Sequence, residues 1–169
     1  MTTGKSLFKQ IFGLALIMLL LSGCGGSAPA SSSSPGLGTP VSGGKWEVTI
    51  TNARAEKQLM GSDGTRYTPN SGFTFLVVDA TFRNLDSSQE TKITADSIAV
   101  MDRAGEVFKN VGSGFALTYS LGGAVTYSND QSNSLKLGLV FSVKTANIDQ
   151  AFNFQFMDVP PIAFTVKSK

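Results

Sequence analysis

The stretch FTFLVVDATFRN, residues 73–84, decides the fold class of this chain. Its apolar side chains recur at every second position, and successive side chains of a strand point to opposite faces. One face holds Leu76, Val78, Ala80 and Phe82. The other combines Phe75 and Val77 with Asp79, Thr81 and Arg83. We therefore predict a strand with one apolar face and one mixed face.

Alternation with the same period occurs on both sides of this strand, from residue 45 onward. Clusters of turn-forming residues at 61–64 (GSDG) and 69–72 (PNSG) separate the runs. Residues 112–133 are rich in Gly, Ser and Asn and predict a long loop with a weak strand near 116–119. Several short strands without a convincing helix predict an antiparallel β-sandwich. A closed lipocalin-type sheet around a cavity is the alternative. The alternating apolar sets are Trp46, Val48 and Ile50; Ile98 and Val100; Leu135, Leu137, Leu139, Phe141 and Val143; Phe152, Phe154 and Phe156; and Ile162, Phe164 and Val166.

The chain begins with the pattern of a secretory leader. Residues 1–10 carry Lys5 and Lys9 and no acidic residue, and residues 11–21 (IFGLALIMLLL) are apolar apart from Gly13. A basic segment, a short apolar segment and small residues in this order predict a signal peptide at 1–23. The apolar run is shorter than the about 20 residues that span a bilayer. A membrane helix with a buried cysteine, or ordinary secretory cleavage at 28–30, are the alternatives.

The leader ends in Leu21-Ser22-Gly23-Cys24, which resembles the lipobox of bacterial lipoproteins. The resemblance implies cleavage before Cys24, a diacylglyceryl thioether on its thiol and acyl chains such as palmitate. Two or more chains give stable membrane anchoring. It therefore implies a protein anchored through Cys24 on the extracytoplasmic side of a bacterial membrane, at the plasma membrane's outer face or the outer membrane.

The segment after the lipobox predicts a spacer. Residues 25–44 are mainly Gly, Ser, Pro and Ala, without charge or apolar periodicity. Such a segment buries too little surface to offset its ordering entropy. We therefore expect residues 24–44 to be a lipid-bearing flexible tether, or a glycosylated Ser-rich stretch, and residues 45–169 to be the folded domain.

Charge and residue usage exclude several classes of function. Without Lys5 and Lys9 of the leader, 12 basic residues face 12 acidic ones, and the basic residues form no run. A nucleic-acid binder needs a basic stripe, so we expect no nucleic-acid partner. The chain has no histidine and one cysteine, which removes the commonest general base, an intrachain disulfide and Cys/His zinc sites. We expect neither an enzyme nor a cofactor.

Four segments follow in an order typical of a known domain: KWEV (45–48), GFTFLVVDATFRN (72–84), MDRAGEVF (101–108) and GLVFSV (138–143). Together they are similar to the telokin-like, immunoprotective-antigen-like immunoglobulin domain of unknown function on many bacterial lipoproteins. The resemblance spans nearly the whole domain and implies an immunoglobulin-like antiparallel β-sandwich of about seven strands. Residues 128–133 depart from the Pro-Gly turn common in that family. The family has no established active site, so no catalytic residue is implied.

Three groups of residues are candidates for binding. Asp102, Gly105 and Glu106 would suit a calcium loop, but their spacing favours a hairpin turn. Residues 129–133 (NDQSN) carry oxygen donors and one charge, but their composition favours a solvated loop. Aromatic residues in the Gly-rich segment are either contact residues for a partner or folded back onto the core. They are Phe115, Tyr119 and Tyr127.

These patterns favour a non-catalytic binding module on the cell envelope, with an envelope protein or polymer as its partner. The alternatives are a structural or accessory envelope protein and a carrier of a small apolar ligand. A carrier would need a cavity lined by the alternating Phe residues.

Overall fold

The computed structural model of the protein describes residues 36–86, 91–115, 118–121, 125–127 and 134–166. These residues form strands joined by turns and two short 3₁₀ segments, so the all-β prediction is confirmed. No helix among them is long and apolar enough to cross a membrane. The strands are β1 (Val41–Gly43), β2 (Trp46–Glu56), β3 (Leu59–Gly61), β4 (Arg66–Tyr67), β5 (Phe73–Asn84), β6 (Thr91–Ile93), β7 (Ile98–Met101), β8 (Val107–Phe115), β9 (Thr118–Leu121), β10 (Val125–Tyr127), β11 (Ser134–Lys144), β12 (Ala151–Phe156) and β13 (Val159–Thr165), and the 3₁₀ segments are η1 (Ala95–Ser97) and η2 (Thr145–Asn147).

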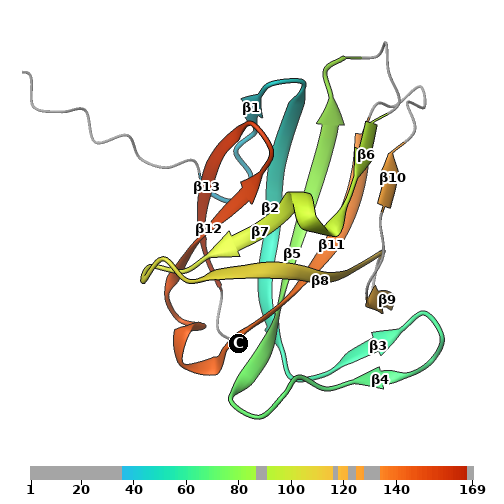
Figure 1. Ribbon diagram of the computed structural model, residues 1–169, viewed down its shortest axis with the longest axis vertical. Coiled ribbons are helices and arrows are strands. Elements are labelled where there is room, and N and C mark those ends of the chain that lie inside the picture. The colour runs from blue at the N-terminus through green and yellow to red at the C-terminus, as the bar shows by residue number, and fades with distance from the viewer. Residues whose placement is uncertain (1–35, 87–90, 116–117, 122–124, 128–133, 167–169) are drawn as a thin grey trace, which may run out of the picture. The chain divides into compact units, whose positions relative to one another are not determined.

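Strand β8 joins two layers. The main hydrogen-bonded path runs β1-β2-β5-β11-β8-β7-β12-β13, and Figure 1 shows β7 and β8 crossing in front of β2, β5 and β11. The first half of β8 pairs with β7 and the second half with β11. Between them the pairing passes from Val140↔Gly112 to Phe141↔Asn110, so Val111 is an extra residue. Such a bulge bends a strand and lets it change sheets.

The main core lies between these layers. The inward-facing apolar side chains of β2, β5 and β11 pack against those of β7, β12 and β13. The ring centroids of Phe82 and Phe156 lie 5.0 Å apart, and those of Trp46 and Phe156 lie 5.5 Å apart, both edge to face. Leu76, Val78 and Phe82 are fully buried here, so the apolar face predicted for residues 73–84 is confirmed.

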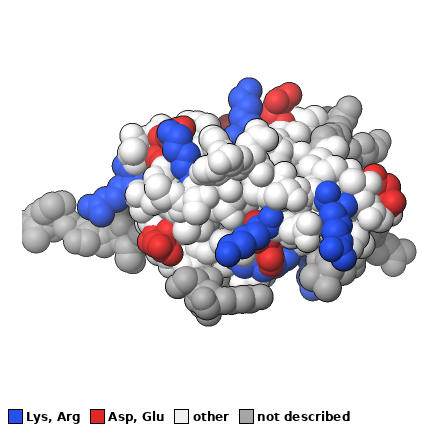
Figure 2. Space-filling model, turned by 90° about the horizontal axis from the view of Figure 1, so that it is seen from below, with Lys and Arg blue, Asp and Glu red and all other residues white. Residues whose placement is uncertain are grey.

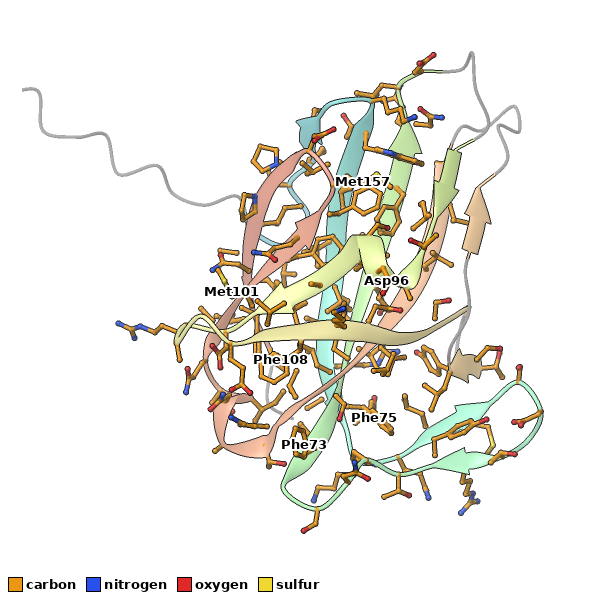
Figure 3. The ribbon with its side chains drawn as sticks, viewed as in Figure 1. Phe73, Phe75, Asp96, Met101, Phe108 and Met157 are labelled. Atoms are coloured by element: carbon orange, nitrogen blue, oxygen red, sulfur yellow. The ribbon has the colours of Figure 1, made fainter. Side chains whose placement is uncertain are left out.

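A second, smaller core covers the mixed face of β5. Phe75 and Val77 pack with Val140 of β11, Leu59 of β3 and Tyr119 of β9. Figure 3 shows Phe75 beside the β3–β4 hairpin, with Phe73 further towards the strand's start. Strand β3 pairs antiparallel with β4 and parallel with β9, so the sheet is mixed. This layer of β3, β4 and β9 covers one end of the outer sheet face.

The Gly-rich segment differs from the predicted long loop. Strand β8 continues through residue 115, and β9 folds back antiparallel onto it. A Cβ atom at Gly112 would lie 2.6 Å from the carbonyl oxygen of Ser120, and one at Gly114 would lie 2.0 Å from that of Thr118. These glycines permit close strand approach, whereas composition alone suggested turns.

The domain begins earlier than residue 45. Strand β1 pairs with β2 through Val41↔Val48, and the Gly38 N–H donates to the carbonyl of Ile50. Val41 is buried and Leu37 packs against the main core. The last part of the segment expected to be a tether therefore belongs to the fold. Residues 24–35 lie outside the described residues, as does the predicted leader.

Candidate functional site: a polar recess on the outer sheet face

A bulge in β2 brings charged side chains to the outer face. The pairing with β5 passes from Ile50↔Ala80 to Asn52↔Asp79, so Thr51 is an extra residue. Ile50 and Ala53 consequently both point into the core, with 0% and 1% exposure. If β2 kept regular alternation through Thr51, the pattern begun by Trp46 and Ile50 would direct Arg54 inward. The bulge therefore allows β2 to contribute both to the core and to a polar site.

Arg54 is the centre of a polar cluster. Its guanidinium forms an ion pair with Asp79 of β5, and its Nε lies 3.2 Å from Oε1 of Glu56. A second guanidinium nitrogen donates a hydrogen bond to the Tyr119 hydroxyl oxygen. Asn52 Nδ2 donates to the same Asp79 oxygen, Oδ2, at 3.1 Å. Strands β2, β5 and β9, distant in the sequence, are thereby tied together through one side chain.

Tyr119 is the covered member of this cluster. Its side chain is only 2% exposed. Burial raises the pKa of the Tyr119 phenol above its ordinary value, and the charges of Asp79 and Glu56 raise it further, while Arg54 acts in the opposite direction. The phenol is thus neutral at neutral pH. Its role is that of a hydrogen-bonding and packing group.

Gly138 of β11 leaves room for this arrangement. It pairs directly with Asp79 on one side and with Gly114 on the other. A Cβ atom at Gly138 would lie 3.0 Å from Cε1 of Tyr119 and 3.1 Å from Oδ1 of Asp79. Without that atom, the phenol ring lies directly over the strand.

A recess of about 480 Å³ opens next to the cluster. Its volume is within the range of ligand sites, about 300–1,000 Å³. The lining combines a cation, a carboxylate and hydroxyl groups, while the side chains of Ala80 and Leu137 face the main core. The lining residues are Thr51, Asp79, Ala80, Thr81, Lys136, Leu137 and Gly138. The side chains and backbone groups here offer hydrogen bonds of both kinds and one positive charge.

Two smaller recesses lie over the other layer. One of about 350 Å³ is bordered by Asp96, Gln155 and Met157. The other, about 360 Å³, is bordered by Leu37, Ala163 and Phe164. Among the described residues, no Lys or Arg lines either of them.

Charges elsewhere are mixed. On the face in Figure 2, Lys and Arg side chains alternate with Asp and Glu and form no stripe of one sign. The described residues contain no group of three or more acidic or cysteine side chains able to hold a metal ion.

The residues predicted for the anchor lie outside the described part of the chain. They are Leu21, Ser22, Gly23 and Cys24, and residues 129–133 lie outside it as well. Tyr119 is folded back onto the sheet, which decides between its two predicted roles. The side chains of Phe115 and Tyr127 also lie outside the description.

Strand β7 ends at Met101, and Asp102 begins the hairpin turn that leads to β8. Its Oδ1 accepts hydrogen bonds from the backbone N–H groups of Ala104 and Glu106, at 2.9 and 2.8 Å, and its Oδ2 accepts one from Asn147 Nδ2 at 2.7 Å. Gly105 has a φ of +85°, a conformation that favours glycine. Glu106 pairs with Lys144 at 2.7 Å. The hairpin interpretation of this motif is confirmed by these contacts.

No pattern in the sequence led to the prediction of Arg54, Lys136 or the recess as part of a functional site. One local signal was present: the alternation Trp46, Val48, Ile50 changes phase at Ala53, which indicates a bulge. Asp79 inside an otherwise apolar run was a second signal. Neither signal indicates which strands meet.

Comparison with known proteins concerns the fold alone. An uncharacterized β-sandwich protein from Clostridium difficile 630 is similar in structure, with a TM-score of 0.51, 12% sequence identity, and coverage of 79% of this chain and 95% of that one. The fold is a β-sandwich. A conserved hypothetical protein from Bacillus anthracis has the same TM-score of 0.51 and identity of 12%, covering 77% and 94% of the two chains. No family model matches this β-sandwich chain, and no curated protein matches it either.

Proposed function

We propose that this chain is a lipid-anchored binding protein of the bacterial envelope. Its immunoglobulin-like domain binds an envelope component without catalysis, through the recess on the outer face of β2, β5 and β11. The observation that carries this proposal is the recess itself: about 480 Å³ in volume, with Lys136 and Asp79 in its lining.

The recess is held in shape by its surroundings. Thr51 Oγ1 donates to the Asp79 carbonyl at 3.0 Å, and the Arg54 cluster holds the Asp79 side chain. Binding sites gain affinity when their groups are ordered before the ligand arrives, because less freedom is lost on binding. Positions on paired strands meet this condition better than positions on loops.

The Phe residues support this choice over an apolar carrier. Phe152 stacks on Phe164 with ring centroids 5.9 Å apart, and Phe82 and Phe154 lie 6.3 Å apart. These side chains pack against one another in the core. The recess lies on the opposite face of the sheet, and no Phe is among the described residues that line it.

Filling the recess tests the binding function. In the Thr81→Phe variant we expect an aromatic ring to occupy the recess and abolish binding of envelope fragments released by enzymatic digestion. Thr165→Phe is the matched control and should bind as wild type does, because Thr165 is an exposed position of β13 that borders the separate recess of about 360 Å³. Amide chemical shifts of ¹⁵N-labelled protein measure binding and its location, and thermal midpoints check that both variants fold.

Two results would contradict the proposal. If wild-type protein shows no shift changes with any fragment, binding is refuted, and the structural or accessory role becomes the better account. If Thr81→Phe and Thr165→Phe bind as wild type does, the domain binds elsewhere.

The anchor has its own test. We expect intact mass spectrometry of the membrane-purified protein to show a chain that begins at Cys24 and carries a diacylglyceryl group. The Cys24→Ala variant should lack this mass. An unmodified Cys24, or a chain that begins at another residue, would refute the lipid anchor without affecting the recess.

A further inference from the structure

The register between β11 and β5 determines which charged side chains line the recess. Lys136 pairs with Thr81 across β11 and β5, and the next outward-facing pair is Gly138 with Asp79. Lys136 and Asp79 are therefore diagonal neighbours, whose Cα atoms lie about 7–8 Å apart in such a ladder. Both line the recess. Opposite charges at this spacing can contact two different groups of one ligand.

The negative charge of Asp79 is already balanced by Arg54, which contacts it from β2. Its Oδ2 accepts hydrogen bonds from Arg54 and from Asn52. The ion pairs of the described residues join Arg54 to Glu56 and Asp79, Arg83 to Glu47, and Lys144 to Glu106. None of these pairs includes Lys136, whose side chain is exposed at the recess. Its positive charge is consequently available to a ligand.

Arg83, in the next outward-facing pair along β5 and β11, adds positive charge at the surface. Arg83 pairs with Ser134 and is thus the diagonal neighbour of Lys136. Arg83 is 58% exposed, whereas the side chain of its partner Glu47 is only 26% exposed, and the pair is loose at 3.4 Å. The acidic group lies deeper than the basic one, so an approaching ligand meets the cation first.

The remaining polar groups of the recess suit a ligand that carries hydroxyl groups. Thr51 and Thr81 place hydroxyl groups at the recess, and the Asp79 carboxylate accepts hydrogen bonds. Among the described residues, no aromatic side chain lines it. A neutral sugar would therefore lack the ring-stacking surface that strengthens its binding, and a charged group must supply more of the affinity.

We propose that the recess binds an acidic chain that carries hydroxyl groups, with its phosphate or carboxylate on Lys136 and its hydroxyls on Thr51, Thr81 and Asp79. This inference rests on the proposed binding function and assigns the ligand's chemistry. Charge-assisted hydrogen bonds to Lys136 supply the main attraction, and Arg83 strengthens it from the adjacent row.

The test uses the full-length protein in detergent and three polymers: polyglycerol phosphate, polygalacturonate and neutral dextran. Isothermal titration calorimetry measures affinity, and amide chemical shifts locate the site. We expect one or both acidic polymers to bind at the recess, dextran to bind far more weakly, and affinity to fall as salt is raised. Phosphate or carboxylate is identified by which acidic polymer binds.

Charge removal provides the matched comparison. Lys136→Gln should weaken binding by about tenfold, the loss of one charge-assisted contact. Lys109→Gln removes an equally exposed lysine from β8 and should leave affinity unchanged. Unchanged thermal midpoints show that both variants are folded.

Three outcomes would overturn the ligand assignment. They are dextran binding as tightly as the acidic polymers, equal affinities of Lys136→Gln and wild type, and failure of both acidic polymers to bind. If Thr81→Phe still abolishes binding of envelope fragments in those cases, the proposed function stands and only the ligand chemistry is wrong.

Discussion

At the scale of single residues, Tyr119 shows how one side chain links packing to polarity. Its ring covers Val77 and Val140, while its hydroxyl accepts a hydrogen bond from Arg54. A buried hydroxyl with a charged donor is worth about 1.5–3 kcal/mol. The sequence left two roles open for this residue, because an aromatic side chain in a Gly-rich segment has no period that reveals its partner.

We predict that Tyr119→Phe lowers the free energy of unfolding by about 2 kcal/mol at pH 7. The raised pKa of Tyr119 also predicts a pH effect. The phenol's contribution is complete below about pH 10, the unfolded value, and is lost as pH rises through the higher folded pKa. Urea unfolding from pH 7 to pH 11 measures both effects.

In Tyr119→Phe the alkaline loss of stability should be smaller than in wild type. Tyr67→Phe is the comparison, because Tyr67 is more exposed and its hydroxyl donates to Asp63 at 3.3 Å. Burial and the charge of Asp63 also raise the pKa of the Tyr67 phenol, so this variant shows the effect of removing a raised phenol that Arg54 does not contact. Identical pH dependence in wild type and Tyr119→Phe would show that the phenol does not titrate differently in the folded protein.

At the scale of elements, two bulges and a set of glycines decide how strands meet. The bulge at Thr51 changes the phase of β2, and the one at Val111 lets β8 serve both layers. Glycines at 112 and 114 allow β9 to lie against β8. Strand β9 in turn carries Tyr119 to the Arg54 cluster beside the recess, so this cluster depends on a stretch that composition alone assigns to a loop.

We predict that Gly114→Ala displaces β9 and destabilises the fold by about 1–3 kcal/mol, the usual cost of overpacking. The new Cβ atom would meet the Thr118 carbonyl oxygen at 2.0 Å, and a backbone atom cannot move aside cheaply. Gly36→Ala is the control, since nothing lies within 4 Å of its Cβ position. Urea midpoints and hydrogen exchange of the β9 amides measure the change.

Faster exchange confined to β9 and its partners would agree with local displacement. If Gly114→Ala were as stable as Gly36→Ala, the close contact between β8 and β9 would not exist in solution.

At the scale of the whole domain, the segment before residue 45 contributes to stability. Strand β1 extends the sheet of β2, β5 and β11 beyond β2. Gly43 of β1 lies against Asp158 and Val159 at the start of β13. Val41 and Leu37 add apolar side chains to the main core. Burial of one such side chain contributes about 1.5–3 kcal/mol.

We therefore predict that a chain beginning at Lys45 is less stable than one beginning at Gly36, by about 2–4 kcal/mol. Loss of Val41 and of the β1–β2 hydrogen bonds is the cause. Urea unfolding of the two shortened chains, each compared with the full-length protein, measures the difference. Equal stability of the two would restore the predicted boundary at residue 45.

The sequence by itself determined the strands with clear period-two alternation and which of their side chains face the core. Period-two alternation in residues 73–84 is a local property of an extended chain, and Leu76, Val78 and Phe82 are buried as that period requires. The turn at Asp102 was likewise predictable, because an Asx side chain and a following glycine shape their own backbone.

Only the tertiary structure decided where the recess lies. Its cation comes from β11 and its carboxylate from β5, and that carboxylate is held by Arg54 of β2, which also binds Tyr119 of β9. Their meeting depends on the register between strands far apart in the chain, and no local pattern encodes that register. The bulge at Thr51 places Arg54 on the outer face, whereas regular alternation would direct it into the core.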